Sequence, residues 1–144
     1  MSKLFTVGYE AKTQSELIDQ LKAAGVEIVI DVRAIAASRR AGFSKTILAS
    51  SLAAEGIDYV HLRALGTPKA GRDAARKGHI SKMHDIFEGQ LAEPQAQVEL
   101  GRATEIAGER KAALLCFEAD ACGCHRAVVA ERMGERSRFE VVEL

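Results

Sequence analysis

Residues 116–126 hold the densest group of reactive side chains in this chain. They read Cys-Phe-Glu-Ala-Asp-Ala-Cys-Gly-Cys-His-Arg and follow an apolar run. A cysteine beside a histidine, an arginine and a helix start has the surroundings that lower a thiol's pKa and make it a nucleophile. Cys124, His125 and Glu118 are therefore predicted catalytic residues, and Arg126 a ligand-binding residue. The alternative is that Cys124 and His125 only pack or cap the helix.

Metal binding is a second chemistry that this segment allows. Cys122, Cys124 and His125, with Cys116 or His61 added, offer the soft ligands that suit zinc. Structural zinc sites usually combine two separated pairs of ligands, whereas the chain has one cluster. We therefore predict no cofactor and no metal ligand. A structural zinc site or a thiol-redox site in this segment remains the alternative.

Asp31 and Arg33 form a second cluster, at the end of the apolar run Val26–Val32. A charge at the end of a buried strand is costly unless it is paired or hydrogen-bonded. The two residues either form a structural ion pair or have a catalytic role, in which Asp31 orients the arginine to hold a phosphate or carboxylate. Arg39 and Arg40 follow closely and are predicted to bind the same anion, unless they are simply solvated.

The formal net charge of zero conceals an uneven distribution. Residues 33–82 carry ten basic and three acidic side chains, a net charge of +7, while residues 1–32 sum to −2 and residues 83–144 to −5. A basic block of this kind marks either an anion-facing surface or a solvated face with acids nearby in space. The expected partner is an anionic small molecule or nucleic acid. The oligomeric state stays open.

Length and composition point to one cytoplasmic domain. A chain of 144 residues, 47% hydrophobic and 28% charged, has ordinary globular values, so we predict a single domain over residues 1–144. No apolar run approaches the roughly 20 residues that span a bilayer, and the first residues do not resemble a signal peptide. Three cysteines is an odd number, which argues against a disulfide framework and for reduced thiols.

Short apolar runs alternate with helix signals along the chain. The expected strands are Leu4–Val7, Val26–Val32, Ile57–Leu62, Ala112–Phe117 and Phe139–Val142. Five helices are expected. The first begins at a capping box of Thr13 and Glu16 and ends at Gly25, and the second runs from Ser44 to Gly56. The others cover Ile80–Leu91, Pro94 to about Gly108, and Arg126–Met133 with Gly134 as the stop. This alternation predicts a three-layer α/β domain with a mainly parallel sheet of about five strands.

In an open parallel sheet, ligands bind beyond the carboxyl ends of the strands. The reactive clusters above all follow strands, and Tyr9 and His61 follow two more, so both are predicted ligand-binding residues. We expect Arg33, Arg39, Cys124, His125 and Arg126 to share one pocket with Asp31 and Glu118. The segment from Arg63 to Gly78 reads as a long loop, with or without a short helix, and resembles a lid because it lacks the spacing of a phosphate loop.

The motifs resemble those of the domain-of-unknown-function family DUF488 over nearly the whole chain. The resemblance rests on Thr6-Val7-Gly8-Tyr9, Asp31-Val32-Arg33, Ser38-Arg39-Arg40 before Gly42-Phe43-Ser44, Tyr59-Val60-His61-Leu62 before Leu65-Gly66, and Leu115-Cys116-x-Glu118 before Cys124-His125-Arg126. Members often have a Gly-His-Ser type sequence in place of Gly8-Tyr9-Glu10, and a proline where this chain has Ile35-Ala36-Ala37. The resemblance implies the fold and the site but supplies no reaction.

Two classes of function are consistent with these residues. The first is an enzyme that acts on a phosphorylated small molecule, a nucleotide or a nucleic acid, with arginines holding the anion. The second is a non-catalytic module whose basic surface docks nucleic acid or an acidic partner. We favour the enzyme because reactive groups cluster at strand ends. Within the site, Cys124 is expected to be a more reactive thiol than Cys116, which lies inside an apolar strand.

Overall fold

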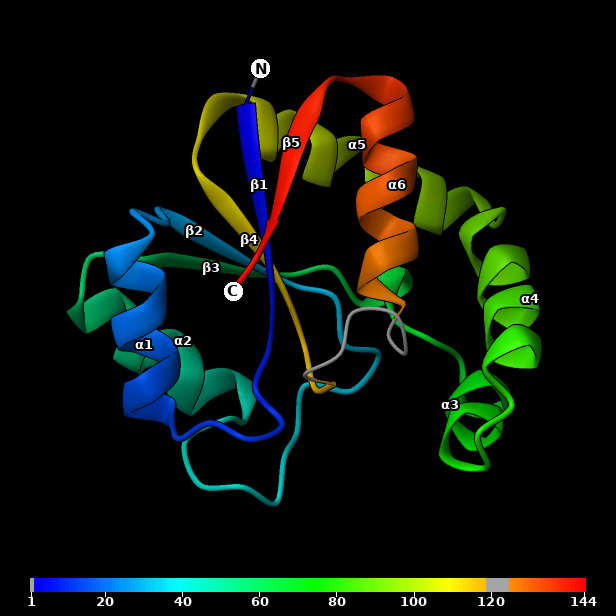
Figure 1. Ribbon diagram of the computed structural model, residues 1–144, viewed down its shortest axis with the longest axis horizontal. Helices are drawn as coiled ribbons and strands as arrows, with labels where there is room; N and C mark the ends of the chain where they lie inside the picture. The colour runs from blue at the N-terminus through cyan, green and yellow to red at the C-terminus, as the bar shows by residue number, and fades with distance from the viewer. Residues whose placement is uncertain (1, 119–124) are drawn as a thin grey trace.

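Five parallel strands form one sheet in the order β3-β2-β4-β1-β5 (Figure 1). The computed structural model describes residues 2–118 and 125–144. The strands are β1 (Ser2–Gly8), β2 (Ile28–Asp31), β3 (Asp58–His61), β4 (Ala112–Cys116) and β5 (Phe139–Glu143). The predicted five-stranded parallel α/β domain is confirmed, and even the short last strand runs parallel, beside β1.

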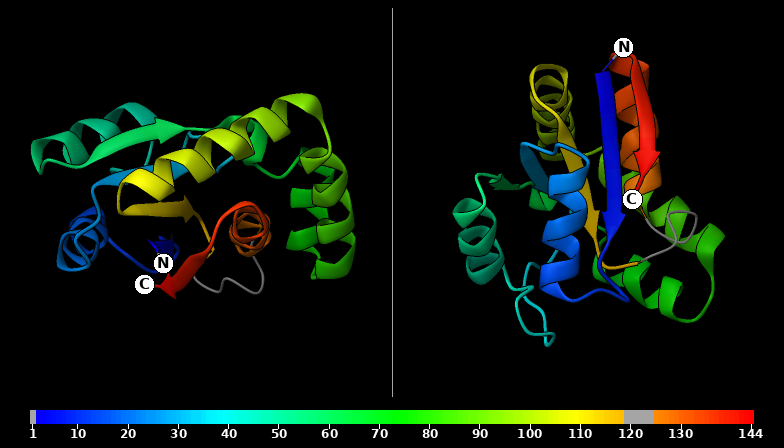
Figure 2. Two further views of the ribbon diagram at one scale, coloured as in Figure 1. Left: turned by 90° about the horizontal axis from the view of Figure 1, so that it is seen from above. Right: turned by 60° about the vertical axis from the view of Figure 1, so that its left-hand side comes forward.

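Helices cover both faces of the sheet (Figure 2). The helices are α1 (Gln14–Ala23), α2 (Lys45–Ala54), α3 (Lys69–Arg76), α4 (Ile80–Leu91), α5 (Pro94–Glu109) and α6 (Arg126–Arg136), with a 3₁₀ turn, η1 (Arg63–Leu65). Leu17, Leu48 and their neighbours on α1 and α2 pack against one face in one apolar core. Phe87, Leu100 and Met133, on α4, α5 and α6, belong to a second core on the other face. The result is three layers.

The expected helix starts at Thr13 and Ser44 are both found, but the two residues act differently. The Thr13 hydroxyl accepts a hydrogen bond from the Glu16 amide (3.1 Å), and the Glu16 carboxylate accepts from the Thr13 amide (2.9 Å), which completes the capping box. Ser44 stands at the N-cap of α2 without a side-chain cap. Its hydroxyl accepts from the Ser38 amide instead (3.0 Å), and so ties down the loop after β2.

The segment 63–78 contains the short helix that the sequence allowed, the eight-residue α3, and the 3₁₀ turn η1 before it. One expected boundary is wrong, because Gly134 does not stop α6, which continues to Arg136. A glycine inside an exposed helical turn costs only about 1 kcal/mol, and burial of Met133 beside it favours continuing the helix. No helix within the described part of the chain is long and apolar enough to cross a membrane.

The connections from β1 and β4 leave the sheet in opposite directions. From β1 the chain passes through α1 to β2, whereas from the neighbouring strand β4 it passes through α6 to β5. The two helices lie on opposite faces of the sheet. Loops that diverge in this way open a space at the carboxyl ends of the two strands, which is where ligands bind in such sheets.

Candidate functional site

A cavity of about 490 Å³ opens at the carboxyl ends of β1 and β4. A smaller hollow of about 130 Å³ shares five of its lining residues, so we treat the two as one crevice. The shared residues are Thr67, Arg72, Phe117, Glu118 and His125. Glu10, Arg76 and Met83 line only the larger part, and Tyr9, Arg33 and Ile35 only the smaller. The crevice therefore gathers side chains from the ends of three strands, from α3 and α4, and from the start of α6.

Glu118 is a carboxyl group in the wall of the crevice. It follows β4 and is half-buried. Burial raises the pKa of its carboxyl, and the nearby Glu10 carboxylate adds to the rise, although the Arg126 guanidinium opposes it. A carboxyl shifted in this direction holds a proton closer to neutral pH than an ordinary glutamate does, which is the property of a general acid or base.

His125 is a buried, neutral histidine at the N-cap of α6. Its Nε2 donates to the carbonyl oxygen of Val32 (2.6 Å), and because a carbonyl only accepts, the ring hydrogen must be on Nε2. Burial lowers the pKa of His125 to about 4, with the charge of Arg126 contributing. At neutral pH the ring is therefore uncharged.

Asp31 and Arg33 form a buried ion pair, and each guanidinium nitrogen of Arg33 donates a hydrogen bond within the protein. Arg33 Nη2 lies 2.6 Å from Asp31 Oδ2, and its Nε donates to Oδ1 at 2.8 Å. The third guanidinium nitrogen, Nη1, donates to the Phe43 carbonyl (2.7 Å) and to the Tyr9 hydroxyl (3.2 Å), and the Tyr59 hydroxyl donates to Asp31. Burial lowers the pKa of Arg33, but the Asp31 carboxylate outweighs it and raises the pKa overall. Arg33 thus supports the crevice wall.

Tyr9 and Arg40 fix the loop between β1 and α1. The Tyr9 ring stacks on Phe43, with centroids 4.3 Å apart, and meets the edge of Phe117 at 5.4 Å. The Arg40 guanidinium donates to the carbonyls of Tyr9, Glu10 (2.8 Å) and Lys12, so three backbone oxygens of that loop converge on one side chain. Tyr9 is 4% exposed, which leaves only a small part of its ring on the crevice surface.

Arg126 lies behind the crevice wall. The side chain is buried, and its Nη1 donates to Cys116 Sγ (2.9 Å) and to the backbone oxygen of Glu118. Arg126 therefore braces the turn that presents Glu118.

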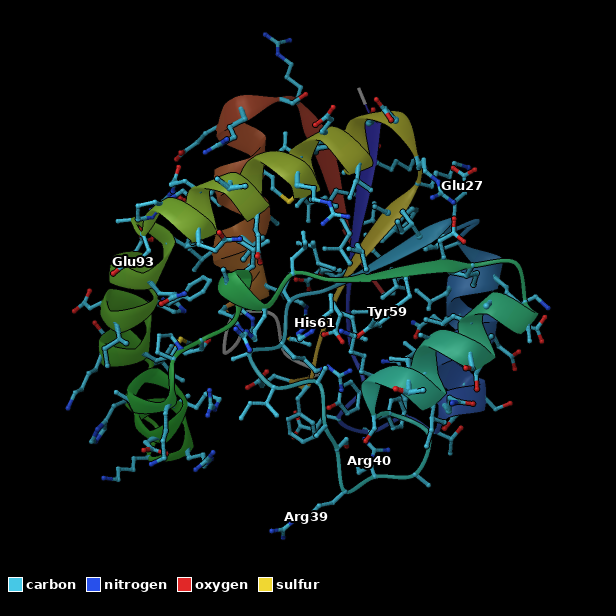
Figure 3. All side chains as sticks on the ribbon, turned by 180° about the vertical axis from the view of Figure 1, so that it is seen from behind. Glu27, Arg39, Arg40, Tyr59, His61 and Glu93 are labelled. Carbon is cyan, nitrogen blue, oxygen red and sulfur yellow. The ribbon has the colours of Figure 1, made fainter. Side chains whose placement is uncertain are left out.

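The remaining predicted residues lie elsewhere. Arg39 is exposed and points away from the molecule, so the expectation that it shares the pocket is wrong (Figure 3). It sits on a loop that Ser38, Arg40 and Ser44 anchor, and this geometry turns it outward. His61 is half-buried, donates from Nε2 to the Arg33 carbonyl (2.6 Å) and lines a separate hollow. Cys122 and Cys124 lie outside the described residues. Within residues 2–118 and 125–144, no three His, Cys, Asp or Glu side chains group as a metal site would require.

Sequence reasoning missed the contribution of α3. Arg72 lines both parts of the crevice, and its Nη1 donates to the Thr67 carbonyl at 2.9 Å. Gly66 lets the loop before α3 pack closely against the loop after β2, because a Cβ there would lie 2.2 Å from the backbone nitrogen of Ala34. The excess of basic residues in 33–82 was the available signal for Arg72. The close approach of two loops was not readable from the chain.

The comparisons with known proteins place the chain in a family without assigning it a reaction. The model of the family described as Domain of unknown function DUF488 matches residues 13–133. Those residues contain most of the crevice, from Arg33 through Arg72 to His125. No curated protein and no solved structure matches the chain significantly.

Proposed function

This chain belongs to the DUF488 family, and we propose that it is an enzyme that binds a phosphorylated small molecule, a nucleotide or a nucleic-acid end in the crevice. The observation that carries the proposal is that the Glu118 carboxyl and the Arg72 guanidinium line the same cavity. One group is suited to moving a proton, and the other is suited to holding a phosphate through two parallel N–H donors. We propose that it acts in the cytoplasm.

The cavity suits a ligand of this kind in size and lining. A volume of about 490 Å³ falls within the range of small-molecule sites, roughly 300–1,000 Å³. Phe117 is 43% exposed beside it and offers an apolar face to a sugar or base. Arg72 makes no ion pair with any described residue, so its charge is available to a ligand.

The residues have distinct roles in this proposal. Glu118 donates or accepts a proton at the reacting group, and the neutral His125 ring lines the crevice beside it. Arg72 holds the phosphate, and Asp31 with Arg33 keeps the wall in place. That Cys124 acts as a nucleophile, or only forms part of the wall of the site, remains a prediction from the sequence. The alternative of a thiol-redox site also remains a prediction.

A ligand screen tests the binding half of the proposal. Nucleotides and sugar phosphates are added one at a time while the melting temperature is recorded. A ligand at about 100 times its Kd stabilises the fold by about 2.7 kcal/mol, which corresponds to several degrees for a chain of this size. We expect the Arg72→Gln variant to lose this shift and Arg39→Gln, an exposed arginine outside the crevice, to keep it. No shift with any phosphate, or a full shift in Arg72→Gln, would overturn the proposal.

Turnover separates the enzyme from a non-catalytic binding module, which the basic block of residues 33–82 also favours. Each ligand that stabilises the protein is incubated with wild type and with Glu118→Gln, and phosphorus NMR and mass spectrometry follow the products. An enzyme converts the ligand, and the isosteric variant binds it but converts it about 100-fold more slowly or worse. A wild-type protein that binds the ligand and leaves it unchanged is a binding module.

A further inference from the structure

A second, basic surface begins where the crevice ends. Two shallow hollows, of about 580 and 590 Å³, lie side by side and share Ala34, Ile35 and Arg63. We call this surface the basic groove and define it by the cations and the histidine that line it, which are Lys45, His61, Arg63, Lys69 and Arg72. Figure 3 shows His61 in the middle of this side of the molecule, between α2 and α3.

Lys69 pairs with Asp73 (3.2 Å), but the other cations of the basic groove are only weakly balanced. No carboxylate lines the first hollow, which has Lys45 and Arg63 in its wall. The second contains one, Glu99, whose oxygens accept hydrogen bonds from the Ala64 amide (2.8 Å) and from Gln95 (3.0 Å). Neither Lys45 nor Arg63 forms an ion pair with a residue that the structure describes, and both are exposed.

The basic groove is continuous with the crevice. Arg72 lines the second hollow and both parts of the crevice, and Ile35 lines both hollows and the smaller part of the crevice. Ile35 is 59% exposed, so an apolar side chain stands among the cations at the junction. A row of cations with an apolar contact beside it fits a chain of phosphates that carries sugars and bases.

We propose that the basic groove binds the backbone of a single-stranded nucleic acid and leads one nucleotide of the strand into the crevice. The proposal rests on the proposed function and deepens it, because it takes the ligand of the crevice to be part of a strand. A single strand is favoured over a duplex, since a cavity of about 490 Å³ holds a base only when that base is unpaired.

The test measures binding of a fluorescein-labelled oligothymidylate of roughly 20 nucleotides, long enough for the usual site sizes of single-strand binders, by fluorescence anisotropy over a range of salt concentrations. The variant Lys45→Gln/Arg63→Gln removes two exposed cations of the groove outside the crevice. Lys3→Gln/Lys111→Gln is the matched control, because those two lysines are also exposed but lie around a hollow at the amino ends of the strands. Oligouridylate and a blunt duplex of equal length are measured in parallel.

We expect wild type and the control variant to bind the single strand equally. The groove variant should bind about tenfold more weakly or worse at low salt, and its slope of log K against log salt should fall by about 1.4, which is two contacts at about 0.7 each. The two oligonucleotides tell whether the strand is DNA or RNA. A duplex that binds as tightly as the strand, an unchanged groove variant, or equal losses in both variants would overturn the inference.

The melting-temperature shift caused by a mononucleotide keeps the two proposals apart. If a mononucleotide stabilises the protein but no oligonucleotide binds through Lys45 and Arg63, the inference about the groove fails and the proposed function stands. If the oligonucleotide binds through the groove but no mononucleotide or sugar phosphate stabilises the protein, the groove stands and the crevice proposal fails. The melting temperatures of the unliganded variants show that each is folded.

Discussion

Arg33 and Asp31, two residues apart in the chain, form a buried ion pair in which Nη2 lies 2.6 Å from Oδ2. The Asp31 carboxylate is fully buried and the Arg33 side chain is 6% exposed. The same arginine also donates to the backbone of Phe43, so the pair ties the end of β2 to the start of α2. Charges this deeply buried are stable only together, and that makes them sensitive to substitution.

Asp31→Asn should lower the free energy of unfolding by about 3–5 kcal/mol, because it leaves the Arg33 charge buried without its counter-ion. The measurement is urea unfolding. Asp58→Asn is the control, since Asp58 pairs with Arg110 at 2.8 Å on the surface, where loss of an ion pair costs less than about 1 kcal/mol. Equal effects of the two substitutions would show that the buried pair has no special importance.

The buried His125 should make the fold less stable in acid. Its pKa is lowered to about 4 in the folded protein and is 6.5 ordinarily, so between these values the unfolded chain binds the additional proton. Stability is then fully present above about pH 6.5 and falls by roughly 3 kcal/mol as the pH drops to about 4. His125→Gln keeps a donor for the Val32 carbonyl without titrating. Urea unfolding at several pH values should show a smaller slope in this variant, and an identical slope would contradict the prediction.

Glu118 should have the opposite dependence on pH. Its carboxyl pKa is raised in the folded protein, so the folded state holds the proton more tightly than the unfolded chain does. The free energy of unfolding therefore falls as the pH rises from 4.5 through the pKa of the folded state. Glu118→Gln should therefore be more stable than wild type at neutral pH, with the advantage vanishing below the ordinary pKa of 4.5. Glu16→Gln is the comparison of opposite sign, because the capping box lowers the pKa of Glu16. A Glu118→Gln variant that is less stable at neutral pH would refute the assignment.

Gly66 should be intolerant of even one added methyl group. A Cβ there would lie 2.2 Å from the Ala34 nitrogen, so Gly66→Ala must push two loops apart and should cost about 3 kcal/mol or more. Gly89→Ala is the matched control, since nothing lies within 4 Å of its Cβ position in the exposed turn of α4. That substitution should stabilise the helix by about 0.5–1 kcal/mol. Thermal unfolding of both variants compares them, and a mild effect at Gly66 would mean that the loops separate easily.

Local sequence determined the fold class and the end of the sheet where polar groups gather. Apolar runs of strand length, the capping box at Thr13 and Glu16, and the alternation of strands with helices are short-range features, and the structure confirms the parallel sheet that they predict. Because all five strands are parallel, their carboxyl ends share one edge. Glu118, His125, Tyr9 and Arg33 consequently line one crevice, as the residues after each strand indicated.

Only the tertiary structure decided which of these side chains are turned toward the crevice with free N–H groups and which are used within the fold. The Arg33 guanidinium donates its hydrogen bonds to Asp31 and Phe43, and the Arg40 guanidinium donates to backbone carbonyls after β1. Phe43 and these carbonyls reach the two arginines only when separate loops pack together. Arg39, beside Arg40 in the chain, points outward, while Arg72, which the sequence did not single out, lines the crevice from α3. Pattern and capping act within a few residues, whereas the partner of a guanidinium depends on which distant backbone oxygens the fold brings within about 3 Å of it.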